Sequence, residues 1–247
     1  MERPIRGMLS GTGTPMNSEN RRKLLVEQEL FSRLPESEVA ELAEASHIVE
    51  LAKGDELFHK GDPGSHLYIV ARGVLKAVTT SQEGDDLVFN LMGPGQIIGE
   101  LAIFSGGRRS ATISAMEESQ LIVLRRNAVL PFLKSHPDAA FTLLAVLAER
   151  VQRVSELVED TQFRNLPSRL AKKLVELGDD YGEELDAGFR VSVSMSQEEL
   201  GDLVGTTRES INKQMREWKA AGIASMNQGK ITIHDREALE TLAASES

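Results

Sequence analysis

One short loop, residues 99–112, places acidic and basic side chains at opposite ends of a glycine-rich turn. Its sequence is GELAIFSGGRRSAT, with Glu100 near the start and Arg108 and Arg109 near the end. A guanidinium donates paired hydrogen bonds to an anion, whereas a carboxylate accepts them. From the loop alone two interpretations stay equally open. It is either a surface ion pair beside a Gly-Gly turn, or a loop that presents both charges to a ligand.

A second group of polar side chains has the types and spacing that read DNA. Arg208, Glu209 and Lys213 fall on one exposed face if their segment, TRESINKQMREWK, is helical. Arginine and lysine reach O6 and N7 of guanine in the major groove, and glutamate accepts from cytosine N4. Thr207 and Ser210 carry short hydroxyls suited to flanking phosphates. In isolation, a solvated helix with i,i+4 charge pairs explains Arg208 and Glu209 better, so the neighbouring elements decide.

Those neighbouring elements predict a helix-turn-helix followed by a hairpin. Ser196, with a glutamate three residues later, matches a capping box that begins one helix, and Gly205 ends that helix. Gly201 in its middle is expected to let the next helix approach closely. Thr206 or Thr207 caps the second helix, and the segment ASMNQGKITIHD predicts a hairpin that forms a wing. In this setting the polar residues of both helices become DNA-binding candidates, Ser196 and Thr206 included.

The overall charge opposes DNA binding unless the binding face is local. The 247 residues hold 28 Lys and Arg against 38 Asp and Glu, a formal net charge of −10. Phosphates repel such a chain as a whole. Between residues 206 and 219, however, basic residues outnumber acidic ones. We therefore expect a locally basic recognition face on an acidic protein.

Composition excludes several other kinds of site. The absence of cysteine rules out disulfides and thiolate metal sites, and it suits the reducing cytoplasm. No apolar run approaches the roughly 18 residues of a membrane span, and the first residues lack the apolar stretch of a signal peptide. No activated nucleophile or carboxylate pair emerges, so we do not expect an enzyme. Because the spacing of the histidines matches no ligand motif, we expect neither haem nor metal at His47, His59, His66 or His136.

Between about residues 47 and 126 the pattern predicts a small antiparallel β domain. Glycine-containing turns separate the short runs HIVEL, ELFHK, HLYIVAR, VLKAVTT, DLVFNLM, SATISAM and SQLIVLRR. Such alternation is typical of a barrel or jelly roll. Two helical segments are expected before it, within residues 21–46, and a loose tail before those.

After Pro137 the pattern is helical for about 27 residues. An apolar seam in steps of three and four favours pairing with a parallel second copy over packing on its own domain: Leu144, Leu147, Val151, Val154, Val158 and Thr161. The segment LPSRLAKKLVELGDDYG predicts a further helix that stops at Gly178, and VSVSM a short strand.

Together these elements resemble the CRP–FNR family of bacterial transcription regulators. The resemblance covers about residues 30–235 and rests on HKGDPGSHLYIVARGVLKA, GELAIFSGGRRSA, the long helix and VGTTRESINK. It implies an α+β fold in four parts: a flexible tail (1–20), a cyclic-nucleotide-binding barrel or jelly roll (21–136), a dimerisation helix (137–165) and a winged helix-turn-helix (166–247). It further implies a homodimer that regulates transcription allosterically, on a palindromic double-stranded DNA site and with RNA polymerase as a partner.

The resemblance also assigns roles within the glycine-rich loop. Arg109 matches the arginine that grips the cyclic phosphate, because Ser110 and an alanine follow it as in the family motif; Arg108 is the rival. Glu100 is expected to accept the ribose 2′-hydroxyl. Gly99 lets the backbone approach the sugar, and the turn that begins at Leu101 presents N–H groups to the anion.

One departure from the family leaves the ligand open. Where the family offers Thr-Ser to the adenine, this chain has Val154 and Ser155, so a hydroxyl has become a methyl. Cyclic AMP is the favoured effector and cyclic GMP the alternative. A regulator that needs no ligand, with the barrel as a scaffold, is the other alternative.

Overall fold

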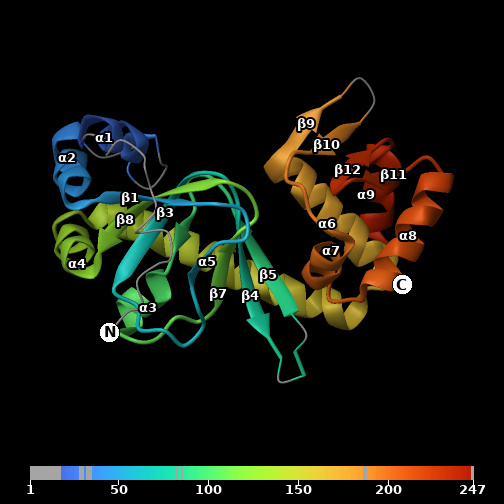
Figure 1. Cartoon of the computed structure of the whole chain (residues 1–247), viewed down its shortest axis with the longest axis horizontal. Coiled ribbons are helices and arrows are strands. Elements are labelled where there is room, and N and C mark those ends of the chain that lie inside the picture. The colour runs from blue at the N-terminus through green and yellow to red at the C-terminus, as the bar shows by residue number, and fades with distance from the viewer. Residues whose placement is uncertain are drawn as a thin grey trace. The chain divides into compact units, whose positions relative to one another are not determined.

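The computed structural model describes residues 18–27, 31, 35–81, 83–84, 86–185 and 188–245. The chain divides into two compact units: residues 1–79 with 90–150, and residues 80–89 with 151–247. Figure 1 shows the element order from blue to red. The predicted tail lies outside the described residues as far as residue 17, and helix α1 begins at Ser18.

Residues 47–125 build two four-stranded sheets. The first has the order β1-β8-β3-β6: β1 (His47–Leu51), β8 (Ser119–Arg125), β3 (His66–Arg72) and β6 (Ile97–Ile98). The second has the order β2-β7-β4-β5: β2 (Glu56–Phe58), β7 (Thr112–Ala115), β4 (Leu75–Thr80) and β5 (Asp86–Met92). The register pairs β1–β8, β3–β8, β3–β6, β2–β7 and β4–β7 antiparallel. Each of the seven predicted β runs contains one of these strands, and β6 is additional.

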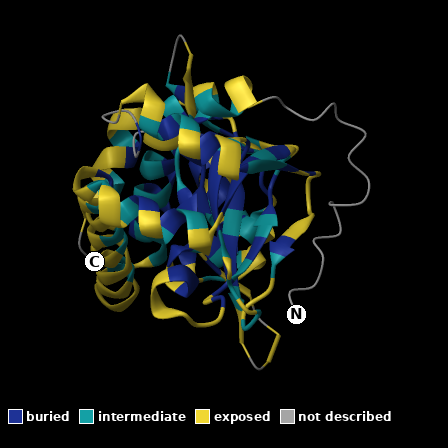
Figure 2. Ribbon diagram, turned by 90° about the vertical axis from the view of Figure 1, so that its left-hand side faces the viewer, coloured by how far each residue is buried: buried dark blue, intermediate teal, exposed yellow. Residues whose placement is uncertain are grey.

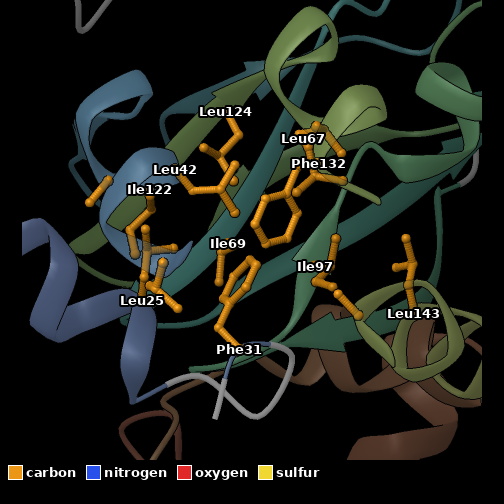
Figure 3. Close-up of a cluster of buried hydrophobic side chains, with 14 of the residues drawn as sticks. Leu25, Phe31, Leu42, Leu67, Ile69, Ile97, Ile122, Leu124, Phe132 and Leu143 are labelled. Carbon is orange, nitrogen blue, oxygen red and sulfur yellow. The ribbon is translucent and has the colours of Figure 1, made fainter. Parts of the chain in front are cut away.

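The first sheet has a core on each face, because successive side chains of a strand point to opposite sides. Tyr68 and Val70 of β3 join one buried cluster, which also takes residues of the second sheet. Leu67 and Ile69 join the other, with residues of five helices: α1 (Ser18–Val26), α2 (Glu36–Ala45), α3 (Glu100–Ser105), α4 (Arg126–Ser135) and α5 (Pro137–Phe163). Figure 3 shows this second cluster, and Figure 2 shows that many residues of the strands are buried.

Helix α5 has the 27 residues that the sequence predicts. Ala139 and Leu143 in its first turns are buried in the core. Most of the predicted seam is exposed, with Leu144 at 58%, Val151 at 67% and Val158 at 58% exposure. A stripe of large apolar side chains on a helix, left uncovered by its own chain, is typical of a face that pairs with another helix.

The second unit combines short helices with a small antiparallel sheet. Its helices after α5 are α6 (Leu166–Tyr181), α7 (Gln197–Val204), α8 (Arg208–Ala220) and α9 (Arg236–Ala244). The sheet has the order β11-β12-β10-β9: β11 (Ala224–Asn227), β12 (Lys230–Ile233), β10 (Phe189–Val191) and β9 (Gly182–Glu184). The mixed α+β class is thus confirmed, with strands, a long helix and a helix-turn-helix in the predicted order.

Two local predictions in this unit are wrong. Helix α6 does not stop at Gly178 but continues to Tyr181. A Cβ at Gly178 would lie 2.1 Å from the ring of Phe189, so this glycine makes room for a ring and does not end a helix. The strand predicted as VSVSM ends at its first residue, Val191, and the next four residues lead into the cap of α7.

The helix-turn-helix itself follows its sequence signals. Ser196 and Glu199 form the predicted capping box, and Gly205 ends α7 with a φ of 70°. Thr207, not Thr206, caps α8 by accepting a hydrogen bond from the backbone N–H of Ser210. Gly201 lies where the turn crosses the helix, because a Cβ there would be 2.7 Å from the carbonyl oxygen of Thr206.

Replacing Gly201 with alanine is expected to destabilise this unit, although alanine is the better helix former by about 1 kcal/mol. The added methyl forces the backbone of the turn to move, which costs about 1–3 kcal/mol. Fluorescence of the buried Trp218 during thermal unfolding reports the change. An unchanged or higher melting temperature contradicts the close crossing described above.

Candidate functional site

A buried ion pair joins the glycine-rich loop to the long helix. Glu100 begins the short helix α3 (Glu100–Ser105) and is only 2% exposed. Its Oε1 atom accepts a hydrogen bond of 2.6 Å from Nη1 of Arg150 on α5. Nη2 of Arg150 donates to the carbonyl of Ile97, just before the loop. Arg150 therefore binds a side chain of the predicted ligand loop and the backbone of the strand that precedes this loop.

Sequence reasoning missed Arg150. It precedes Val154 by four residues and so lies on the same side of the helix as this predicted ligand residue. That spacing was the signal by which the sequence could have identified Arg150 as a site residue. Without the fold it is one of several charges on a long helix. Burial of a carboxylate is costly unless it is paired, so the fold requires a cation at this position.

Arg109 is the second buried charge of the loop, at 3% exposure. Its Nη1 atom donates to the carbonyls of His66 (3.0 Å) and Gly99 (3.2 Å). The guanidinium carbon lies 4.1 Å from the ring centroid of Phe58 and 5.4 Å from that of Tyr68. These contacts fix the direction of the side chain, and the aromatic faces favour its positive charge.

Gly99 has a more specific task than the sequence indicates. Its φ of 86° lies in the left-handed region, which favours glycine. A Cβ at this position would also lie 2.2 Å from Nη1 of Arg109. Gly99 thus makes room for the arginine, and the expectation that it admits a sugar stays a prediction.

The structure distinguishes the two adjacent arginines. Arg108 is exposed, and its Nη1 donates to the carbonyl of Gly61 at 2.7 Å. The backbone of Arg109 is held by the turn at residues 61–62: its N–H donates to the carbonyl of Asp62, and its carbonyl accepts from Gly61, both at 2.8 Å. Because neighbouring side chains of an extended segment point in opposite directions, only Arg109 turns inward.

The remaining predicted ligand residues are exposed. Leu101 is 51% exposed, and Ser110 follows Arg109 on the surface. On α5, Val154 is 55% exposed, and the Ser155 hydroxyl donates to the carbonyl of Val151 within the helix. The structure brings Gly99, Glu100 and Arg109 together, whereas the participation of the exposed residues stays a prediction.

Two histidines lie at the starts of β1 and β3, and one of them, His66, binds Arg109 through its backbone carbonyl. The rings of His47 and His66 meet edge to face, with centroids 6.4 Å apart. Burial lowers the pKa of His47, and the nearby His66, Arg125 and Arg21 lower it further. These surroundings therefore favour the neutral form of His47. The described residues contain no group of three or more His, Asp or Glu side chains that could hold a metal ion.

The predicted DNA-reading residues Arg208, Glu209 and Lys213 are exposed in the first two turns of α8. Ile211, Met215 and Trp218 of the same helix are buried. The start of α8 therefore presents these polar side chains to solvent, as contact with a DNA groove requires.

The hydroxyl candidates at the helix starts have roles within the fold. Thr207 Oγ1 and Ser210 Oγ are 3.1 Å apart, so these two hydroxyls share a hydrogen bond. Ser196 caps α7, and Thr206 is half-buried in the turn before α8. Contact of any of them with a phosphate stays a prediction.

None of the helices in the described part of the chain is long and apolar enough to cross a bilayer.

Two domain families match the chain. The cyclic nucleotide-binding domain matches residues 48–136, and the Crp-like helix-turn-helix domain matches residues 168–242. These ranges contain the buried Glu100 and Arg109 and the exposed face of α8, respectively.

Similar proteins match this chain over most of its length. The CRP-like cAMP-activated global transcriptional regulator of Mycobacterium tuberculosis is 30% identical over 217 residues, which is 88% of this chain and 97% of that protein. The cyclic AMP receptor protein of Thermus thermophilus is 28% identical and covers 77% of this chain and 85% of its own.

Solved structures show the same fold. A CRP/FNR-family transcriptional regulator of Thermus thermophilus has a TM-score of 0.67 at 28% identity, covering 81% of this chain and 100% of that one. FixK2 of Bradyrhizobium japonicum has a TM-score of 0.73 at 18% identity, covering 82% and 99%. The chain therefore belongs to the CRP/FNR family, whose members are transcription regulators and not enzymes.

Proposed function

We propose that this protein is a DNA-binding transcription regulator whose effector, a cyclic nucleotide, is held by Arg109 and Glu100. The observation that carries the proposal is the pair of opposite charges, each no more than 3% exposed, in one loop of the matched domain. A buried charge is stable only with partners, and a buried, specifically partnered charge is a candidate functional group. A cyclic phosphodiester with a free ribose hydroxyl carries the two groups that these side chains recognise.

The phosphate is assigned to Arg109. Its carbonyl partners and the ring of Phe58 hold the guanidinium in one orientation before any ligand arrives. A planar guanidinium grips two oxygens of a phosphodiester at once, and a fixed one loses little freedom on binding. The exposed Ser110 adds a hydroxyl or a backbone donor beside it.

The ribose is assigned to Glu100, whose carboxylate also binds Arg150. A 2′-hydroxyl that donates to the carboxylate changes a hydrogen bond that already belongs to α5. Nucleotide binding therefore acts directly on the long helix. This contact supports allosteric control, because a ligand shifts an equilibrium only through different interactions with its two states.

Cyclic AMP is the favoured effector and cyclic GMP the alternative. The names of the Mycobacterium tuberculosis and Thermus thermophilus relatives both refer to cyclic AMP. Val154, however, offers a methyl where the family offers a hydroxyl, which leaves base recognition to Ser155 and the surrounding surface. A regulator that needs no effector is less consistent with two buried charges in a loop.

We propose a second copy of the chain as the partner of α5. The exposed stripe of Leu144, Val151, Val154 and Val158 has the a/d spacing of a parallel coiled coil. A parallel pair places two α8 helices on one DNA duplex, in major grooves about 34 Å apart on a palindromic site. In this mechanism the nucleotide shifts the population toward the dimer state with that spacing, and RNA polymerase is the partner at the promoter.

Replacing Arg109 with alanine is expected to weaken cyclic AMP binding by on the order of 3 kcal/mol or more, because a bidentate charge-assisted contact is lost. Titration calorimetry measures this change. Arg108→Ala is the matched control, since the adjacent guanidinium is exposed and bonds to Gly61. If both variants bind as the parent does, the phosphate lies elsewhere.

Val154→Thr is expected to strengthen the effect of cyclic AMP on DNA affinity. Threonine has nearly the shape of valine, so the seam survives, and the added hydroxyl supplies one hydrogen bond worth about 0.5–1.5 kcal/mol. DNA binding is measured with and without cyclic AMP and cyclic GMP. If the effect of each nucleotide on DNA affinity is the same in Val154→Thr as in the parent while the dimer stays intact, this position does not read the base.

Arg208→Ala is expected to relax specificity at one base pair by about 1–3 kcal/mol, because the guanidinium that reads guanine is removed. Binding to single-base variants of a selected site measures the loss. Lys213 lacks a bidentate fork, so Lys213→Ala should relax a different position to a smaller extent. A uniform loss on all sequences would instead make Arg208 a phosphate contact.

A further inference from the structure

A second side-chain network lies at the joint between α5 and α6, far along the chain from the ligand loop. Helix α5 ends at Phe163 and α6 begins at Leu166, so only Arg164 and Asn165 separate them. Asn165 caps α6 by accepting a hydrogen bond from the N–H of Ser168 at 3.0 Å. The function proposed above gives this network no role.

Arg164 connects three parts of the second unit. Its Nε atom bonds to Oδ1 of Asp160, in the last turns of α5, at 2.8 Å. Its Nη1 atom donates to the carbonyl of Ala243, at the end of α9, at 2.6 Å. The same Nη1 lies 3.2 Å from the hydroxyl of Ser168 in the first turn of α6. One guanidinium thus contacts both sides of the joint and a segment nearly eighty residues later.

Ser168 completes the connection. It is fully buried, and its hydroxyl donates to the carbonyl of Ser245 at 2.8 Å. The last carbonyls of a helix lack partners within it, and a cation at that end is favourable. The end of α9 therefore gains its hydrogen bonds from the joint. Lys172 of α6 also binds Asp160, through the other oxygen of the same carboxylate at 2.7 Å, and so adds a second link between the two helices.

We propose that Arg164 and Ser168 are positioning residues for DNA binding: by binding segment 243–245, they fix the direction in which α6 leaves α5. Helix α6 packs against α9 and α7, so its direction is that of the helix-turn-helix. The inference that the direction of α6 sets the spacing of the two recognition helices rests on the dimer proposed above. Two recognition helices match successive major grooves only if each joint holds one angle.

The direct test measures, within one chain, the distance between a position on α5 and a position on α8, which lie on opposite sides of the joint in the sequence. The sequence has no cysteine, so cysteines introduced at the exposed Glu159 of α5 and Glu217 of α8 take spin labels specifically. Excess unlabelled chain suppresses distances between copies. We expect a narrow distance distribution for the otherwise unaltered chain and a broader one after Arg164→Met or Ser168→Ala. An equally narrow distribution in both variants overturns the proposal, and the measurement needs neither nucleotide nor DNA.

Arg236→Met is the matched control. Arg236 also links α9 to α6, but it does so near the other end of α6, through Asp179 at 2.8 Å. Its loss should leave the distribution narrow, whereas Arg164→Lys, which keeps a cationic donor, should restore part of the order. Thermal unfolding confirms that each variant is folded. Equal broadening in Arg236→Met means general loosening and refutes the specific role.

Ending the chain after Leu242 tests whether Arg164 acts through the carbonyls of Ala243 and Ser245. This truncation should broaden the distance distribution as Arg164→Met does. The two changes together should broaden it little more than either change alone. Independent, additive effects show that Arg164 does not act through this segment.

The proposed effect of the joint on DNA binding is tested with two versions of a selected DNA site. One keeps the natural spacing of its half-sites. In the other the half-sites are moved apart by about three base pairs, which rotates one half-site by roughly 100° about the DNA axis. A rigid dimer engages the altered site with one subunit only and should lose about 100-fold in affinity. The Arg164→Met variant should lose less than about tenfold, because its loosened joint reaches both half-sites. Unchanged discrimination beside a broadened distribution refutes the role in DNA spacing.

Discussion

The candidate site depends on the pairing of Glu100 with Arg150, which joins the glycine-rich loop to the long helix. A carboxylate that is 2% exposed requires a cation, and removal of one partner of a buried pair typically costs about 3–5 kcal/mol. Arg150 comes from α5, so residue 100 of the loop and the long helix share one contact. In the proposed mechanism a ligand hydroxyl donates to the carboxylate that also binds the helix. One side chain then serves both recognition and transmission.

The inward turn of Arg109 depends on space that two glycines leave free. Gly99 and Gly64 leave the volume that the guanidinium fills, since a Cβ at either position would meet its atoms or those of Ala102. Carbonyls of the backbone then orient it, and Phe58 covers one side. A phosphate that replaces water here meets a donor already in place, which is the condition under which a charged contact gains most affinity.

Sequence patterns predicted the elements whose causes are local. The capping box at Ser196, the cap at Thr207 and the left-handed Gly205 each depend on neighbours within a few residues, and all three are present. The patterns failed where distant segments decide. Gly178 looks like a helix stop, yet its reason is the ring of Phe189, and Arg150 and Arg164 resemble ordinary helix charges until the fold supplies Glu100 and the end of α9.

Comparing cyclic AMP with its 2′-deoxy analogue by titration calorimetry tests the central claim most directly. If Glu100 accepts the ribose hydroxyl, cyclic AMP binds saturably and the analogue binds about tenfold or more weaker, as expected for a hydrogen bond to a charged group. Equal affinities for the two compounds, or no binding of either, would contradict the assignment of Glu100 and Arg109 as a cyclic-nucleotide site.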